Sequence, residues 1–207
     1  MGKFLPKTLS GKLWWSAGII VFFAIAGFVA FIFSPLSKAQ IPSSFTDSRQ
    51  SAAGYASVIV GDLSSVSGDI AQLQNLYRAH GSSSAALDII VAATAKHQDA
   101  RDKSILLAAD LEKMARAIPD IRPESAGQIA LVAISSETAL IGKLISQYNE
   151  SLGILLISLR NHFSGTQYQD SAQLNAMVDS INSETESINQ LNDQFVQLMQ
   201  KFDSYYK

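Results

Sequence analysis

Histidine is the side chain best suited to metal binding or proton transfer, and the chain has three, His80, His97 and His162. Metal sites in helical bundles of the di-iron class use Glu-x-x-His pairs on facing helices. No glutamate stands three residues before any of these histidines, and the His-Glu-x-x-His spacing of zinc proteases is also absent. The sequence therefore predicts neither a metal site nor a cofactor.

His97 falls on an apolar helical row, one seven-residue repeat before Ser104. This position predicts a buried, hydrogen-bonded imidazole, and a proton switch or a phosphorelay acceptor is the alternative role. His80 and His162 lie near the ends of their predicted helices. A cation there complements the helix dipole, so their positions need no function.

Carboxylates are the second group of side chains that could do chemistry. Glu184 and Glu186 flank Thr185 in a polar stretch, which indicates either a locally polar part of the fold, open to water or a small ligand, or a packing defect. The remaining cluster mixes both signs of charge along one segment and is typical of a solvated helix face. Its members are Lys96, Asp99, Arg101, Asp102, Lys103, Asp110, Glu112, Lys113 and Arg116.

Several chemistries are excluded by what the sequence lacks. There is no cysteine, so disulfides, thiol catalysis and cysteine-ligated metal sites are ruled out. No glycine-rich phosphate loop, Gly-x-Ser-x-Gly elbow or aspartate-rich calcium loop is present. The net charge of −2 provides no basic field for nucleic acid. We therefore expect a protein that is not an enzyme and does not bind nucleic acid.

Helix-breaking residues divide most of the chain into four segments of similar length. The breaks contain His80-Gly81, Ile118-Pro119 and Ser164-Gly165. They leave predicted helices at about 44–80, 84–118, 123–163 and 167–206. Four helices joined by short loops favour an all-α fold, an elongated antiparallel four-helix bundle with up-down-up-down topology. At about 1.5 Å per residue, each helix is roughly 55–60 Å long.

Apolar residues recur every seven positions in each segment and predict the buried stripe. We expect Ile59, Leu63, Leu111, Leu152, Ile188 and Phe195 to be buried. The third segment is assigned the rows Ile134, Ile141, Tyr148, Leu155, His162 and Leu131, Thr138, Ile145, Leu152, Leu159. The fourth is assigned the rows Leu174, Ile181, Ile188, Phe195, Phe202 and Met177, Leu191, Leu198, Tyr205.

The N-terminal part reads as a membrane anchor. Residues 13–33 are uncharged and strongly apolar, and 21 helical residues span roughly 30 Å, the thickness of a bilayer core. We assign residues 13–34 to a transmembrane helix, 1–12 to a short basic cytoplasmic tail and 35–43 to a linker. Lys12 at the boundary, with Trp14 and Trp15, suits the membrane interface.

Charge asymmetry predicts the orientation of this anchor. Lys3, Lys7 and Lys12 precede the apolar segment, and no acidic residue stands among the first twelve. Positive residues stay in the cytoplasm, so we expect residues 44–207 outside it, on a cell membrane of bacterial type. Residues from Ala39 onward carry a net charge of −6, which suits a soluble domain. A signal peptide cleaved after Ala39 is the alternative, although the apolar segment is longer than usual for one.

Gly54, Gly61 and Gly68 repeat every seven residues in the first predicted helix. They fall on the side facing away from the predicted core. Glycine inside a helix costs about 0.5–1 kcal/mol relative to alanine. Without side chains they allow another backbone to approach closely, as small residues do between membrane helices. We interpret them as a helix-contact face for a second copy or a partner; tolerance of weak helix formers is the alternative.

These features favour a membrane-anchored protein with a structural or protein-interaction role. The alternative is an extracytoplasmic ligand-binding module, because such four-helix bundles are similar in architecture to the sensor domains of chemoreceptors. That likeness is one of architecture alone, which does not define function. With about twelve cytoplasmic residues, such a module would have to act through a separate transducer.

Overall fold

The structure is a computed structural model that describes residues 41–78, 82–166 and 171–206. Within these residues the fold is all-α and no β-strand is found. The expected tail 1–12, the anchor 13–34 and most of the linker 35–43 lie outside the described residues.

Four long helical segments follow one another along the chain. The described helices end and begin close to the predicted positions, at Arg78 and Ser83, at Ala117 and Glu124, and at Phe163 and Ser171. The third segment contains two α-helices joined by a π-helix without a turn. The elements are α2(Ser43–Arg78), α3(Ser83–Ala117), the 3₁₀ turn η2(Ile118–Asp120), α4(Glu124–Lys143), the π-helix η3(Leu144–Tyr148), α5(Asn149–Phe163) and α6(Ser171–Asp203).

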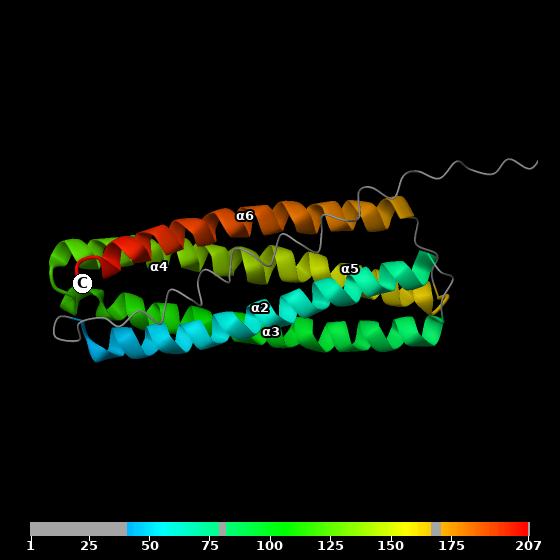
Figure 1. Ribbon diagram of the computed structural model, residues 1–207, viewed down its shortest axis with the longest axis horizontal. Helices are drawn as coiled ribbons and strands as arrows, with labels where there is room; N and C mark the ends of the chain where they lie inside the picture. Colours follow the sequence, from blue (N-terminus) through cyan, green and yellow to red (C-terminus); the bar gives the residue numbers. More distant parts are fainter. Residues whose placement is uncertain (1–40, 79–81, 167–170, 207) are drawn as a thin grey trace, which may run out of the picture.

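The segments run alternately in opposite directions along one elongated bundle (Figure 1). α2 packs closely against α3, and α4 packs against α6, so the bundle consists of two antiparallel hairpins. Packing of α3 on α4 and α5 joins the hairpins. Small side chains explain the close approach of α2 and α3, since a large bulky residue would hold the backbones apart. The buried alanines of these two helices are Ala52, Ala53, Ala56, Ala86, Ala93, Ala100 and Ala117.

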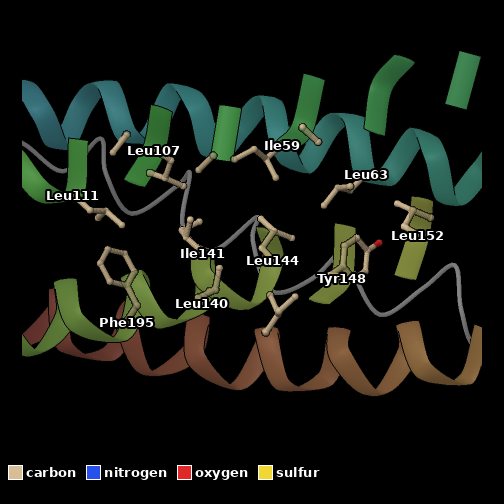
Figure 2. Close-up of a cluster of buried hydrophobic side chains, with 14 of the residues drawn as sticks. Ile59, Leu63, Leu107, Leu111, Leu140, Ile141, Leu144, Tyr148, Leu152 and Phe195 are labelled. Carbon is tan, nitrogen blue, oxygen red and sulfur yellow. The ribbon is translucent and has the colours of Figure 1, made fainter. Parts of the chain in front are cut away.

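The core lies between the two hairpins, where side chains of all four segments meet. Figure 2 shows Ile59 and Leu63 of α2 directed toward the side chains of α4 and η3. All six residues predicted to be buried are confirmed, with exposed fractions of 1–3%. Burial of this apolar surface is the main force that holds the segments together.

The second apolar row predicted for the third segment is wrong in its first half. Leu131 is 47% exposed and Thr138 is also exposed, whereas Ala130, Glu137 and Leu144 form the buried row. After η3, Leu152 and Leu159 are buried as predicted. A π-helix holds one more residue per turn than the α-helix around it. The buried stripe therefore rotates to a new set of sequence positions within a continuous segment.

The second row predicted for α6 is also displaced by one residue. Tyr205 is 41% exposed and Met177, Leu191 and Leu198 are half-buried. The buried row contains two polar residues, which is why an apolar pattern did not reveal it. Its members are Val178, Thr185, Asn192, Met199 and Tyr206. A smaller error falls in α2, where seven-residue spacing extends the apolar row of Ala56, Leu63 and Ile70 to Tyr77, which is 49% exposed.

A buried ion pair and an aromatic contact close the end of the bundle at which α2 begins and α6 ends. The Arg49 guanidinium donates two hydrogen bonds to the Asp203 carboxylate, at 2.8 and 3.0 Å. Phe45 and Phe202 pack beside it with ring centroids 5.4 Å apart. These contacts link α2 to α6 at this end, so the first and last described helices are held together there.

The continuous segment Glu124–Phe163 is, among the described residues, the one helix long and apolar enough to cross a membrane. Nearly half of its most apolar window, 44%, is buried inside the bundle. Glu137 and Lys143 interrupt it within the bundle. Its buried side chains pack within the bundle, whereas Leu131, Val132, Ile154 and Ile157 are exposed.

Candidate functional site

The outer face of α2 carries Gly54, Gly61 and Gly68, all exposed. A Cβ atom placed on any of the three would meet nothing within 4 Å. The glycines therefore point away from the core, as predicted, and no close packing within the bundle requires them. They leave a strip of open backbone along about four helical turns.

This strip is uncharged over most of the helix. In the described stretch from Gln50 to Asn75, every exposed residue is neutral. Beside the glycines, Ser57 is exposed, Val58 is 38% exposed and Val60 is half-buried against the core. An uncharged surface with small side chains loses little hydration when another helix covers it.

The two carboxylates in the middle of α2 are directed toward α3 instead. Asp69 accepts a hydrogen bond from the Lys96 ammonium at 3.0 Å. Asp62 meets Asp99 of α3, carboxyl to carboxyl. Partial burial and the hydrogen bond with Asp99 raise the pKa of Asp62 above its usual range, because one of two facing carboxyl groups must hold a proton to bond the other. Asp62 and Asp69 thus interact within the α2–α3 hairpin, whereas Asp47 is exposed near the start of α2.

The mixed-charge cluster on α3 is for the most part the solvated face predicted from the sequence. Arg116 and Glu112 pair at 2.6 Å on the exposed surface, and Lys103 lies 3.9 Å from Asp99. Asp110 departs from the prediction, since it is only 3% exposed. One of its oxygens accepts a hydrogen bond from Lys113 at 2.6 Å, and this contact raises the pKa of the lysine.

Glu184 is held by hydroxyl groups from two helices. It accepts hydrogen bonds from Ser151 of α5 at 2.8 Å and from Ser180 of α6 at 3.2 Å. Thr185, buried beside it, donates to the carbonyl of Ile181 at 2.8 Å. Burial and the nearby Glu184 carboxylate raise the pKa of Tyr148. The polar stretch is therefore a connection between α5 and α6 rather than a gap in packing.

The prediction for His97 is confirmed. The side chain is 9% exposed, and Nε2 lies 2.9 Å from the backbone carbonyl oxygen of Asn149. His162 packs against Tyr77 and Phe163, with ring centroids 5.3 and 5.5 Å away. His80 lies outside the described residues. The histidines that are described stand apart, and within the described residues no three His, Asp or Glu side chains are grouped to hold a metal ion.

Two buried charged features were not foreseen in the sequence. Glu137 of α4 is 3% exposed, and burial raises its pKa to about 8. Apolar residues three and four positions away on both sides, Ala133, Ile134, Leu140 and Ile141, are the signal that places it inside. The Arg49–Asp203 pair joins residues 154 positions apart, and no local pattern indicates such a partner.

Comparisons with protein-family models, with curated proteins and with solved structures gave no match. The membrane-interface residues Lys12, Trp14 and Trp15 lie outside the described residues. The outer face of α2 is therefore the one predicted contact surface whose geometry can be described.

Proposed function

We propose that this protein is a single-pass membrane protein whose extracytoplasmic helical bundle has a structural or protein-interaction role. Residues 13–34 hold it in the bilayer, the N-terminal tail stays in the cytoplasm, and the bundle projects from the membrane of a bacterial cell. The binding surface is the α2 face built on Gly54, Gly61 and Gly68.

The observation that carries this proposal is the open, uncharged strip on α2. Three glycines in one helix interior reduce its stability, and nothing inside the bundle needs them. A helix that covers the strip would approach the α2 backbone closely and gain dispersion contacts along about four turns. Anchoring in a membrane favours such contacts, because it confines the partners to one plane with a shared orientation.

Single cysteines report the contact directly, because the chain has no native cysteine. The full chain in native membranes would carry one cysteine at Ser57, beside the glycines. A second set would carry it at Ser135, which is exposed on α4. We expect a short thiol cross-linker to capture a second copy or a partner from Ser57→Cys and not from Ser135→Cys.

Enlarging the glycines tests whether the strip itself makes the contact. Gly54→Leu, Gly61→Leu and Gly68→Leu together should abolish the cross-link while the bundle stays folded. Gly142→Leu is the matched control, because Gly142 is also exposed in a helix with open space beside it, on α4. An undiminished cross-link in the triple variant would refute the proposed face.

The alternative function is a ligand-binding module that acts through a separate transducer. A thermal unfolding scan with small molecules distinguishes it from the protein-interaction role. Small molecules that bind the folded bundle raise its melting temperature, and the stabilisation grows with the logarithm of ligand concentration above Kd. A reproducible rise with a small molecule, in a chain that yields no cross-linked partner, would replace the interaction role with the sensor role.

A further inference from the structure

The contact between α3 and α5 is built around a π-helix and a buried histidine. Asn149 is the first residue after η3, and its backbone N–H donates to the carbonyl of Leu144, five residues earlier. Its side chain is 3% exposed, and neither amide atom has a hydrogen-bond partner among the described residues. Wider turns of this kind are rare and usually occur where a helix has a functional constraint.

His97 of α3 covers this turn. A carbonyl oxygen can only accept, so Nε2 of His97 carries the proton and donates to Asn149. Gly153 lies one turn further along α5, and a Cβ there would stand 3.5 Å from Cε1 of the ring. The imidazole of His97 thus lies against the backbone carbonyl of Asn149 and against Gly153.

A second proton would be poorly accommodated at this position. Nδ1 would carry this proton, and no described protein group accepts a hydrogen bond from it. Arg101 of α3 is the charged group that acts on the ring, and it repels a cation. From α5 the ring meets Asn149 and Gly153, which are neutral, and no charge of α2, α4 or α6 contributes. Burial, then Arg101, lower the pKa of His97, and the bond to Asn149 opposes them.

We propose that the α3–α5 contact at His97 is an acid-sensitive joint, in which protonation of the imidazole expels the ring from its place over Asn149 and Gly153 and loosens η3. The unfolded or opened chain binds the proton more tightly than the closed bundle. The stability of the joint is therefore complete above the ordinary histidine pKa and is lost as the pH falls below it. A turn with an unpartnered buried amide is where opening costs least. The proposal is independent of the glycine face.

Hydrogen exchange on the full chain in detergent tests this proposal, at about pH 7.5 and about pH 5 after correction for intrinsic exchange rates. We expect protection of the amides in 144–156 to fall by about tenfold or more on acidification, with a smaller change in α2. His97→Gln keeps a donor for the Asn149 carbonyl and does not titrate. This variant should keep its protection at the lower pH.

His162→Gln is the matched control, because His162 is half-buried at the end of α5 and stands apart from η3. It should respond to acid like the natural chain. Equal acid sensitivity of the natural chain and His97→Gln in 144–156 would overturn the proposal. Should His97→Gln fail to fold, NMR titration of the natural chain decides, since a His97 pKa at or above about 6.5 contradicts the joint.

Discussion

Arg49 and Asp203 form a two-bond ion pair with almost no exposure to solvent, 5% and 1% for the two side chains. The pair fixes the start of α2 against the end of α6. Removing one partner of a buried pair leaves an uncompensated charge, which typically costs about 3–5 kcal/mol. We expect Asp203→Ala to lower the free energy of unfolding by about this amount in chemical denaturation of the full chain in detergent.

Replacing both partners tests whether the loss of stability comes from leaving one buried charge without its partner. Arg49→Met with Asp203→Leu removes both charges and should recover most of the loss, because well-packed apolar residues substitute for many buried ion pairs. Asp193→Ala, at an exposed position on α6, should change stability by less than about 0.5 kcal/mol. A loss of that small size in Asp203→Ala would show that the pair does not hold the end together.

The core assignment is tested by truncation of leucines. Leu63→Ala and Leu152→Ala each remove a side chain that is 1% exposed, and should each cost about 2–5 kcal/mol in the unfolding free energy. Leu131→Ala is the control, since Leu131 is 47% exposed on α4 and should lose far less. Losses under about 0.5 kcal/mol at both buried sites would refute the packing described here.

Glu137 should make the bundle less stable as the pH rises. Its pKa is about 8 in the folded state and close to 4.5 when unfolded, so the folded state holds the proton more tightly. The stabilisation linked to this proton is complete below the unfolded-state pKa of Glu137. It is lost as the pH rises through the folded-state pKa, by an amount on the order of a few kcal/mol. Glu137→Met should abolish this decline. Parallel curves of unfolding free energy against pH for both proteins would contradict it.

Glycine-to-alanine changes should increase stability at some sites and not at others. At Gly54, Gly61 and Gly68 the new Cβ meets open space, so each change should gain about 0.5–1 kcal/mol. At Gly127 the Cβ would lie 3.3 Å from the backbone oxygen of Ile118, so we expect no gain there. Thermal unfolding of the four single variants provides the comparison. A gain at Gly127 equal to the others would mean that α4 shifts freely against η2.

The membrane topology has its own test. With Lys3, Lys7 and Lys12 in the cytoplasm, protease added to intact cells should digest the chain beyond about residue 40 and spare the tail. A tag on the tail and antibodies to the bundle would follow the two parts. A purified protein whose chain begins at Gln40 would show that the segment is a cleaved signal peptide.

Helix number, helix ends and most of α3 could be predicted from the sequence because apolar periodicity and helix breakers are local signals. Seven-residue spacing places Ala86, Ala93, Ala100, Leu107 and Met114 on one apolar row of the second segment, and all five are buried. The misassigned rows of α4 and α6 share a cause, which is the presence of polar residues in the buried row. Glu137 in α4, and Thr185 with Asn192 in α6, make a buried row look mixed, so a neighbouring apolar row was chosen instead.

The π-helix could not be predicted for a different reason. Its signature is a change in which positions face inward, and that change is visible only when both halves of the segment are packed against α3 and α6. The outward direction of Gly54, Gly61 and Gly68 was predicted correctly, because it follows from the α2 rows alone. The long-range Arg49–Asp203 pair depends on tertiary proximity and has no counterpart in the sequence pattern.

The Arg49–Asp203 pair also sets the order of events during synthesis. Arg49 leaves the ribosome early, whereas its partner is made 154 residues later, near the end of the printed chain. Until then the guanidinium must stay in water, so the start of α2 cannot be sealed against α6. A chain that stops before residue 203 therefore lacks the ion pair that joins the start of α2 to the end of α6.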